Sequence, residues 1–227
     1  KPFAIMALNS LSITNIGQLD DASAKQLNDQ RTPIVLLPKT PNCDSQLVGV
    51  APNVSDVGVM LPQTPLHFLL FKSYLDRQEH TQPAHWRSSP HPLLLVATSA
   101  NLSGEPIISD NIKCIEKLAN IADAFIVHDR DILQRCDDSI YQSSTVIRRA
   151  RGWTPSTLAL SHTGASVLGC GANLKNTFCL AHTDKAILSP HMSDLSSAEA
   201  CHHYRQTIEK YLSLLAIKPE AVACDRH

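Results

Sequence analysis

Short apolar segments, each ended by proline, glycine or small polar residues, recur along this chain of 227 residues. Apolar runs of about four to eight residues between such breakers are typical of buried strands. Amphipathic segments of helical period separate several of them, and this mixed order predicts an α/β or α+β fold. We expect strands at residues 3–8, 33–38, 58–61, 93–97, 124–128, 139–141 and 145–149. We expect helices at residues 16–28, 66–75 and 112–121.

The composition fits a chain with a real core, since 43% of its residues are hydrophobic. The net charge of −1 gives no overall basic field for nucleic acid, although a local basic patch is compatible with it. No apolar run approaches the roughly 20 residues of a membrane helix, and no signal peptide precedes the first expected strand. We therefore expect a cytoplasmic protein without membrane contact.

The seven cysteines include no CxxC pair, which argues against a disulfide framework and against a cysteine zinc site. Reduced thiols are the simplest interpretation. The eleven histidines are scattered, and the neighbours His202 and His203 diverge on a helix. We expect no metal site built by this chain alone.

A second domain is expected after a change of composition near residue 155. Residues 156–164 contain several serines and threonines and are expected to form a linker. Strands are then expected at 167–170, 177–182, 185–188 and 221–224, with a long helix at 195–215. The predicted domains are residues 1–155 and 165–227, and both chain ends have the character of fragment boundaries.

The first candidate site follows the strand expected at 93–97, which ends in Thr98, Ser99, Ala100 and Asn101. Side chains at the carboxyl end of a strand in an α/β sheet commonly face a ligand crevice. Hydroxyls and backbone N–H groups in a small-residue turn can bind phosphate or carboxylate oxygens. The alternative is an Asx- or Ser-type turn that holds no ligand.

The second candidate site is a cluster of five arginines and four aspartates within residues 128–151. Arginine's planar fork suits phosphate and carboxylate groups. The aspartates could orient these arginines or hold Mg²⁺ through water. A salt-bridged surface and an RNA contact through Arg148, Arg149 and Arg151 remain alternatives.

The third candidate site is the glycine-rich segment 169–177, between two expected strands. With Lys175 and Thr177 it could cradle nucleotide phosphates, although its glycines do not follow the Walker A order. The alternative is an ordinary β-hairpin.

Taken in order, these motifs resemble the HypF family, the carbamoyltransferases that mature [NiFe]-hydrogenases. The resemblance covers essentially the whole chain and rests on KPFAIM, VGVMLPQTPLHFLL, VATSANLSGEP, HDRDI, RCDDSI, IRRARGWTP, GANLKNTFCL and SPHMSDL. It implies a YrdC-like twisted mixed sheet with helices over residues 1–155. From residue 165 it implies the start of a domain similar to the actin-like, ribonuclease H-like threonylcarbamoyl transferases. It also implies an acylphosphatase domain and a zinc-finger region before residue 1.

The resemblance implies that ATP, with Mg²⁺, and carbamoyl phosphate give carbamoyl-adenylate and pyrophosphate. The carbamoyl group then passes to the C-terminal cysteine of a partner, HypE. The nucleotide- and carbamoyl-binding residues that match the family are Lys1, Thr98, Ser99, Asn101, Ser139, Arg149 and Arg151. The phosphate loop of the second domain matches at Lys175, Asn176 and Thr177.

Departures from the family pattern limit what is carried over. A lysine-rich segment that precedes Lys-Pro-Phe in the family is absent, together with the first strands of the YrdC-like fold. The family's metal-binding histidines lie further along the chain, so His191 and His227 do not inherit that role. The alternative functions are a YrdC-type threonylcarbamoyl-adenylate synthase acting in tRNA modification, and an RNA-binding module.

Overall fold

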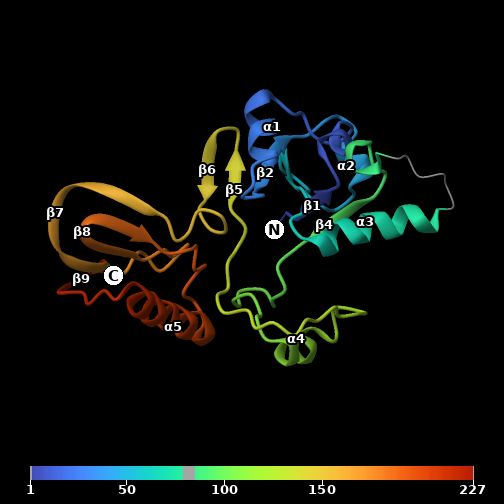
Figure 1. Cartoon of the computed structure of the whole chain (residues 1–227). Helices are drawn as coiled ribbons and strands as arrows, with labels where there is room; N and C mark the ends of the chain where they lie inside the picture. Colours follow the sequence, from blue (N-terminus) through green and yellow to red (C-terminus); the bar gives the residue numbers. More distant parts are fainter. Residues whose placement is uncertain (1, 79–84, 227) are drawn as a thin grey trace. The chain divides into compact units, whose positions relative to one another are not determined.

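The computed structural model describes residues 2–78 and 85–226, and Lys1 lies outside this range (Figure 1). The chain divides into two compact units. The first contains Lys1–Thr98 and Asp138–Arg148, and the second contains Ser99–Asp137 and Arg149–His227. Residues 79–84, in the polar segment 76–92 that the sequence predicts as a loop, lie outside the described range.

A six-stranded mixed sheet forms the first unit, in the order β4-β1-β3-β2-β5-β6. β1 pairs in parallel with β3, as does β2 with β5, and the other neighbours are antiparallel. The strands are β1 (Ala4–Ala7), β2 (Ile34–Pro38), β3 (Asp56–Met60), β4 (Leu94–Ala97), β5 (Ile140–Gln142) and β6 (Thr145–Arg148).

The middle of this sheet is buried, which explains the apolar runs in its sequence. Val59 lies opposite Ile5 on one neighbouring strand and opposite Val35 on the other. All three side chains are 0% exposed, as are Leu37 and Val57. Burial of a valine or isoleucine side chain is worth roughly 1.5–3 kcal/mol, so these residues fix the register of the central strands.

Over the described residues of the first unit, three helices and two 3₁₀ turns accompany the sheet. They are η1 (Ser10–Ile13), α1 (Asp21–Leu27), α2 (Cys43–Gln46), α3 (Pro65–Arg77) and η2 (Trp86–Ser88). α3 begins where a sequence rule predicts it: Thr64 caps the N–H of His67 at 3.3 Å and a proline stands at the first helical position. Phe71 of α3 is fully buried in a cluster with Met6, Leu8 and Met60.

The second unit contains α4 (Asn111–Leu118), α5 (Ala198–Leu215) and a three-stranded sheet in the order β8-β7-β9. Its strands are β7 (Thr157–Gly169), β8 (Cys179–Leu188) and β9 (Ala221–Ala223). Ser197 caps α5 at the N–H of Ala200. Tyr211 of α5 packs against Phe178 with ring centroids 5.4 Å apart, in the core of this unit. Among the described residues, no helix is both long and apolar enough to cross a membrane.

The predicted fold class is confirmed, and most predicted elements lie within a few residues of observed ones. The strand predicted at 124–128 is wrong: in the described chain this segment pairs with no strand, and Ile126 is 71% exposed. An apolar sequence becomes a strand only when a neighbour takes its backbone hydrogen bonds.

Two further expectations need correction. Residues 157–164, expected within a linker, form the first part of β7 and pair with β8, as Leu158 does with Ala186. The two strands expected at 177–182 and 185–188 are one strand, β8, with an irregularity at Thr183. The outer half of this hairpin is exposed on both faces, so its sequence carries little hydrophobic alternation.

Candidate functional site

The loop after β4 is held by its own polar side chains. The Ser99 hydroxyl donates to the Asn101 side-chain oxygen. The Asn101 amide nitrogen donates to the carbonyls of Leu102 at 2.9 Å and Glu105 at 2.8 Å. All the polar atoms of the Asn101 side chain are therefore engaged within the loop. This is the geometry of the ligand-free turn that the sequence left open as an alternative.

The same loop is anchored to α4. The N–H of Ile108 donates to Ala100 at 2.9 Å, and the Lys117 ammonium lies 2.7 Å from the Glu105 carboxylate. Hydrogen bonding to Glu105 raises the pKa of Lys117. The turn is therefore fixed at its base, while Thr98, its neighbour in the first unit, is exposed. If a ligand binds Ser99 or Asn101, a side-chain hydrogen bond within the loop must break, and a hydrogen bond to the ligand replaces it.

Two of the predicted arginines, Arg149 and Arg151, lie in the second unit. The Arg149 guanidinium donates to the Ser156 hydroxyl and lies 5.6 Å from the centre of the Trp153 ring. Its Nε is buried and has no hydrogen-bond partner among the described residues. The N–H of Arg151 donates to the carbonyl of Asp137 at 3.0 Å. A buried, unsatisfied guanidinium nitrogen is costly, and a bound anion would satisfy it.

In the first unit, Ser139 immediately precedes β5 and is 0% exposed. Its carbonyl accepts from the N–H of Ile34 at 2.9 Å, which joins it to β2. A guanidinium nitrogen of Arg148 donates to the carbonyl of Asp138 at 3.4 Å. These residues therefore have structural partners in the sheet, and a ligand-binding role for Ser139 stays a prediction.

The loop between β7 and β8 is shaped around Asn176. This side chain is 1% exposed, and its amide nitrogen donates to the carbonyls of Cys170 at 3.0 Å and Ala172 at 2.6 Å. Its side-chain oxygen is buried without a partner among the described residues. The Asn176 side chain thus joins the two ends of the loop from its buried side, and its side-chain oxygen can still accept a hydrogen bond.

The two neighbours of Asn176 differ from it. Lys175 is exposed, has a positive φ of 49° and donates its N–H to the carboxylate of Asp194 at 2.7 Å. Thr177 is half-buried. The loop therefore presents the lysine outward and the asparagine inward. This arrangement is compatible with a phosphate loop.

A histidine–aspartate pair joins two segments of the second unit. His191 Nδ1 lies 3.1 Å from a carboxylate oxygen of Asp137, and both side chains are mostly buried, at 19% and 17% exposure. Asp137 belongs to the arginine–aspartate cluster, whereas His191 follows β8. No sequence motif assigns a role to His191, and only the fold reveals its partner.

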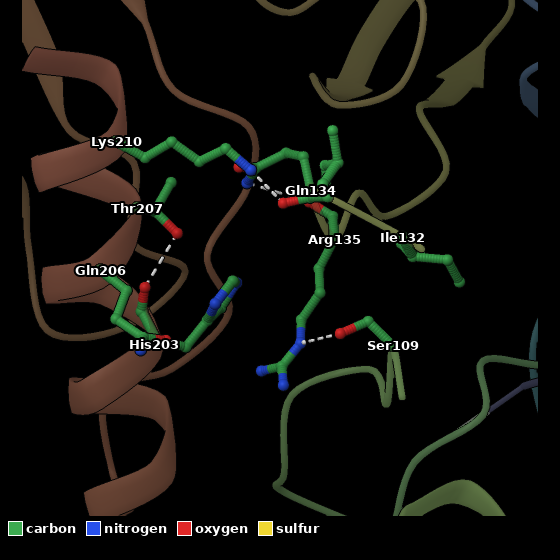
Figure 2. Close-up of a pocket in the computed structure, with 9 residues that line it drawn as sticks. Ser109, Ile132, Gln134, Arg135, His203, Gln206, Thr207 and Lys210 are labelled. Atoms are coloured by element: carbon green, nitrogen blue, oxygen red, sulfur yellow. Dashed lines mark hydrogen bonds between the residues drawn. The ribbon is translucent and has the colours of Figure 1, made fainter. Parts of the chain in front are cut away.

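A cleft of about 250 Å³ opens beside α5 in the second unit (Figure 2). It is lined by Ser109, Ile132, Leu133, Gln134, Arg135, His203, Gln206, Thr207 and Lys210. His203 and Lys210 point from α5 toward the segment that carries Arg135. Apart from Arg135, a member of the arginine cluster, none of these residues was predicted to bind a ligand. They come from segments far apart in the chain, so no local motif marks them.

Burial, together with the smaller effects of the charges of Arg135 and His202, lowers the pKa of His203 to about 4. The imidazole is therefore neutral near pH 7 and has one donor and one acceptor nitrogen. Burial also raises the pKa of Tyr211, about two turns further along α5, to about 12. Tyr211 stays protonated as part of the core.

The described residues provide no cluster of three or more histidine, cysteine or acidic side chains for a metal ion. Asp137, from the cluster that could have held Mg²⁺, is paired with His191. Mg²⁺ at enzyme sites is usually bound through one or two carboxylates together with substrate phosphates. This part of the chain therefore does not fit a resident Mg²⁺ site of its own.

Two family models match the chain. The Sua5/YciO/YrdC model, described as "Telomere recombination", matches residues 1–150, and the model described as "HypF Kae1-like domain" matches residues 162–227. Among curated proteins, the chain is 41% identical to carbamoyltransferase HypF2 of Cupriavidus necator and 40% identical to carbamoyltransferase HypF of Rhizobium leguminosarum bv. viciae. Each alignment covers 100% of this chain. The chain belongs to the HypF family.

The chain spans only 29% of the length of these two HypF relatives. It is also similar to two solved HypF structures. One is full-length HypF in the phosphate- and nucleotide-bound form, with a TM-score of 0.86, 35% identity and coverage of 100% of this chain and 34% of that one. The other is HypF of T. kodakarensis, with a TM-score of 0.85, 30% identity and coverage of 100% and 28%. The HypF fold expected from the sequence motifs is therefore confirmed.

Proposed function

We propose that this chain supplies the carbamoyl-adenylate-forming part of a HypF-type carbamoyltransferase, with the opening of the domain that completes the transfer. The observation that carries the proposal is the similarity over the whole chain to proteins named carbamoyltransferase HypF. A HypF relative of the same fold has been captured with phosphate and nucleotide bound, which supports nucleotide binding by this chain. We assign adenylate formation to residues 1–155 and the start of the transferase domain to residues 165–227.

The proposed reaction uses carbamoyl phosphate and ATP. Hydrolysis of carbamoyl phosphate yields phosphate and carbamate, and a carbamate oxygen then bonds to the α-phosphorus of ATP. The bond from that phosphorus to the bridging oxygen of the β-phosphate breaks, and pyrophosphate leaves with the electron pair. Negative charge develops on phosphoryl oxygens, where fixed donors are most effective.

The residues that would provide these donors are the predicted ones. Arg149, whose buried Nε lacks a partner among the described residues, has a donor to offer an anion. Arg151, through its side chain, is the second proposed phosphate contact. Ser99 and Asn101 lie in a turn of small residues, and their mutual bond can be exchanged for bonds to a carbamate. Thr98, Ser139 and Lys1 complete the proposed set by their match to the family.

In the second step the carbamoyl group passes from the adenylate to a cysteine thiolate at the C-terminus of HypE, and AMP leaves. The loop of Lys175, Asn176 and Thr177 would hold phosphate in the transferase domain, where the unpartnered oxygen of Asn176 can accept a bond. Mg²⁺ would arrive with the nucleotide phosphates, whose charge it neutralises. We place the reaction in the cytoplasm.

The test is ATP–pyrophosphate exchange by the full-length protein, with carbamoyl phosphate in one arm and threonine plus bicarbonate in the other. We expect exchange only with carbamoyl phosphate. We also expect Ser99→Ala and Arg151→Ala each to reduce its rate by about tenfold or more, since lost donors to developing charge are expensive. The matched controls Ser103→Ala and Arg77→Ala remove exposed residues of the same types and should leave the rate unchanged.

Two results would contradict the proposal. Exchange at the wild-type rate in both Ser99→Ala and Arg151→Ala would show that these residues are not part of the adenylation site. Exchange that requires threonine would move the protein to tRNA modification and contradict the proposed substrate.

A further inference from the structure

We propose that the cleft beside α5 is a binding site for a small phosphate-bearing anion, separate from the residues assigned to adenylate formation. None of the residues that line it takes part in the proposed reaction. The cleft lies within the second unit, so all of its walls belong to one compact body. The proposal rests on its charge, its unused hydrogen-bond donors and its size.

The charge of the cleft is one-sided. Arg135 and Lys210 both line it, and no aspartate or glutamate is among its lining residues. Two cations that face a shared, partly enclosed space repel each other, and an anion between them removes that repulsion. The whole chain carries a net charge of −1, so this concentration of positive charge is local.

The hydrogen bonds of Arg135 leave its outer edge available. Its Nε donates to the Ser109 hydroxyl at 3.3 Å, which fixes the plane of the guanidinium. No hydrogen bond or ion pair joins its two terminal nitrogens to another of the described residues. A guanidinium held on one edge and open on the other is suited to bind two oxygens of a phosphate.

Lys210 supplies the second cation. Its ammonium donates to the carbonyl of Leu133, which brings the long side chain across the cleft (Figure 2). An ammonium has three donors, so further hydrogens remain for a ligand. Thr207 donates to the carbonyl of His203 at 2.8 Å and so belongs to the helix rather than to the ligand.

His203 contributes a neutral donor. Its ring points from α5 toward Arg135, and burial holds its pKa at about 4. At pH 7 the ring therefore adds an N–H without adding a third charge. The exposed Gln206, one turn on, adds an amide at the mouth of the cleft. Together these groups offer several hydrogen-bond donors to the oxygens of a phosphate.

Size restricts the ligand. Pockets for drug-sized molecules run from about 300 to 1,000 Å³. A cleft of about 250 Å³ lies below that range and is suited to free phosphate or to a small acyl phosphate. These two sources share the phosphate chemistry, and direct binding measurements distinguish them.

The experiment is a calorimetric titration of the full chain with inorganic phosphate at pH 7, followed by acetyl phosphate, acetate and ATP. We expect saturable binding of phosphate or acetyl phosphate and none of acetate. Arg135→Gln and Lys210→Gln should each weaken binding about tenfold, as is typical of one lost charge-assisted bond. Arg205→Gln and Lys218→Gln remove exposed cations outside the cleft and should bind as the wild type does. Circular dichroism of each variant confirms that it is folded.

Acetyl phosphate binding tighter than phosphate would identify an acyl phosphate as the ligand, and equal affinities would identify free phosphate. The Asn101→Ala variant separates this site from the adenylation site. If it abolishes phosphate binding, the anion binds at the adenylation site and the cleft proposal is overturned. The absence of saturation, equal binding of acetate, or equal losses in the cleft variants and their controls would overturn it as well. None of these results depends on whether carbamoyl-adenylate is formed.

Discussion

At the scale of single residues, His203 is a group whose ionisation differs strongly from its ordinary behaviour. Burial lowers its pKa from 6.5 to about 4, and the charged or titratable groups near it are Arg135, His202 and Lys210. In the unfolded chain the ring regains its ordinary pKa. Between about pH 6.5 and 4 the unfolded state therefore binds more protons than the folded state, so the free energy of unfolding falls as the pH falls.

We predict that His203→Gln removes part of this acid sensitivity. Between pH 7 and pH 5 the wild type should lose about 1 kcal/mol more stability than the variant, a figure reduced for the partial solvent exposure of the ring. Urea denaturation at the two pH values measures this difference. At pH 7 the histidine of the wild type and the glutamine of the variant are both neutral. The difference in their free energies of unfolding at that pH therefore reports the effect of packing alone. Equal pH dependence in the two proteins would show that His203 titrates normally.

Ser99 and Asn101 show what sequence reasoning can and cannot establish about a residue. The abrupt change from an apolar strand to hydroxyl and amide residues correctly located a tightly organised turn. It could not decide whether the amide of Asn101 binds a ligand or its own loop, because both uses require the same residue types. Apart from Arg135, the cleft residues left no sequence signal, since α5 and the segment around Arg135 meet only after folding.

At the scale of elements, the connection between β7 and β8 depends on Gly171. Its φ is +69°, and a Cβ at this position would lie 2.3 Å from the carbonyl oxygen of Thr177. We predict that Gly171→Ala lowers the free energy of unfolding by about 2–4 kcal/mol, from backbone strain and the clash together. Chemical denaturation measures the loss.

Gly164 provides the matched control within the same hairpin. It lies in β7, its φ is not in the left-handed region, and a Cβ there would contact nothing within 4 Å. Gly164→Ala should therefore change stability by less than about 0.5 kcal/mol. A similar loss in both variants would mean that the hairpin tolerates no added side chain and that the loop geometry is not the cause.

Elements were predictable where burial imposes a pattern and less so elsewhere. The central strands of the first sheet have fully buried side chains and were located within about two residues. The exposed first half of β7 was mistaken for a linker, because a strand that buries neither face has no hydrophobic alternation. The prediction for the apolar segment 124–128 was wrong in the opposite sense. Its composition favours a strand, but in the described chain it pairs with no neighbouring strand.

At the scale of the whole molecule, fold class and family followed from the order of motifs rather than from any one of them. Each motif alone had an ordinary structural explanation, and the order of a YrdC-like part before a Kae1-like part distinguishes HypF from a single-domain synthase. Both matches lie in one chain of 227 residues. The order of two domain types is a property of the chain that local propensities do not encode.

The charge distribution of the whole chain argues against the RNA-binding alternative. The net charge is −1, and the arginines that suggested RNA have partners: Arg148 donates to Asp138 and Arg149 to Ser156. A protein that neutralises many phosphates loses affinity steeply with salt as counterions are released.

We predict weak RNA binding whose affinity changes less than about tenfold between roughly 50 and 200 mM salt, as for one or two phosphate contacts. Filter binding with tRNA at both concentrations measures the slope. An Arg148→Ala, Arg149→Ala and Arg151→Ala triple variant should behave as the wild type does. A steep slope that this variant flattens would instead show that the arginines form an RNA interface, and the carbamoyltransferase assignment of Arg149 and Arg151 would have to be abandoned.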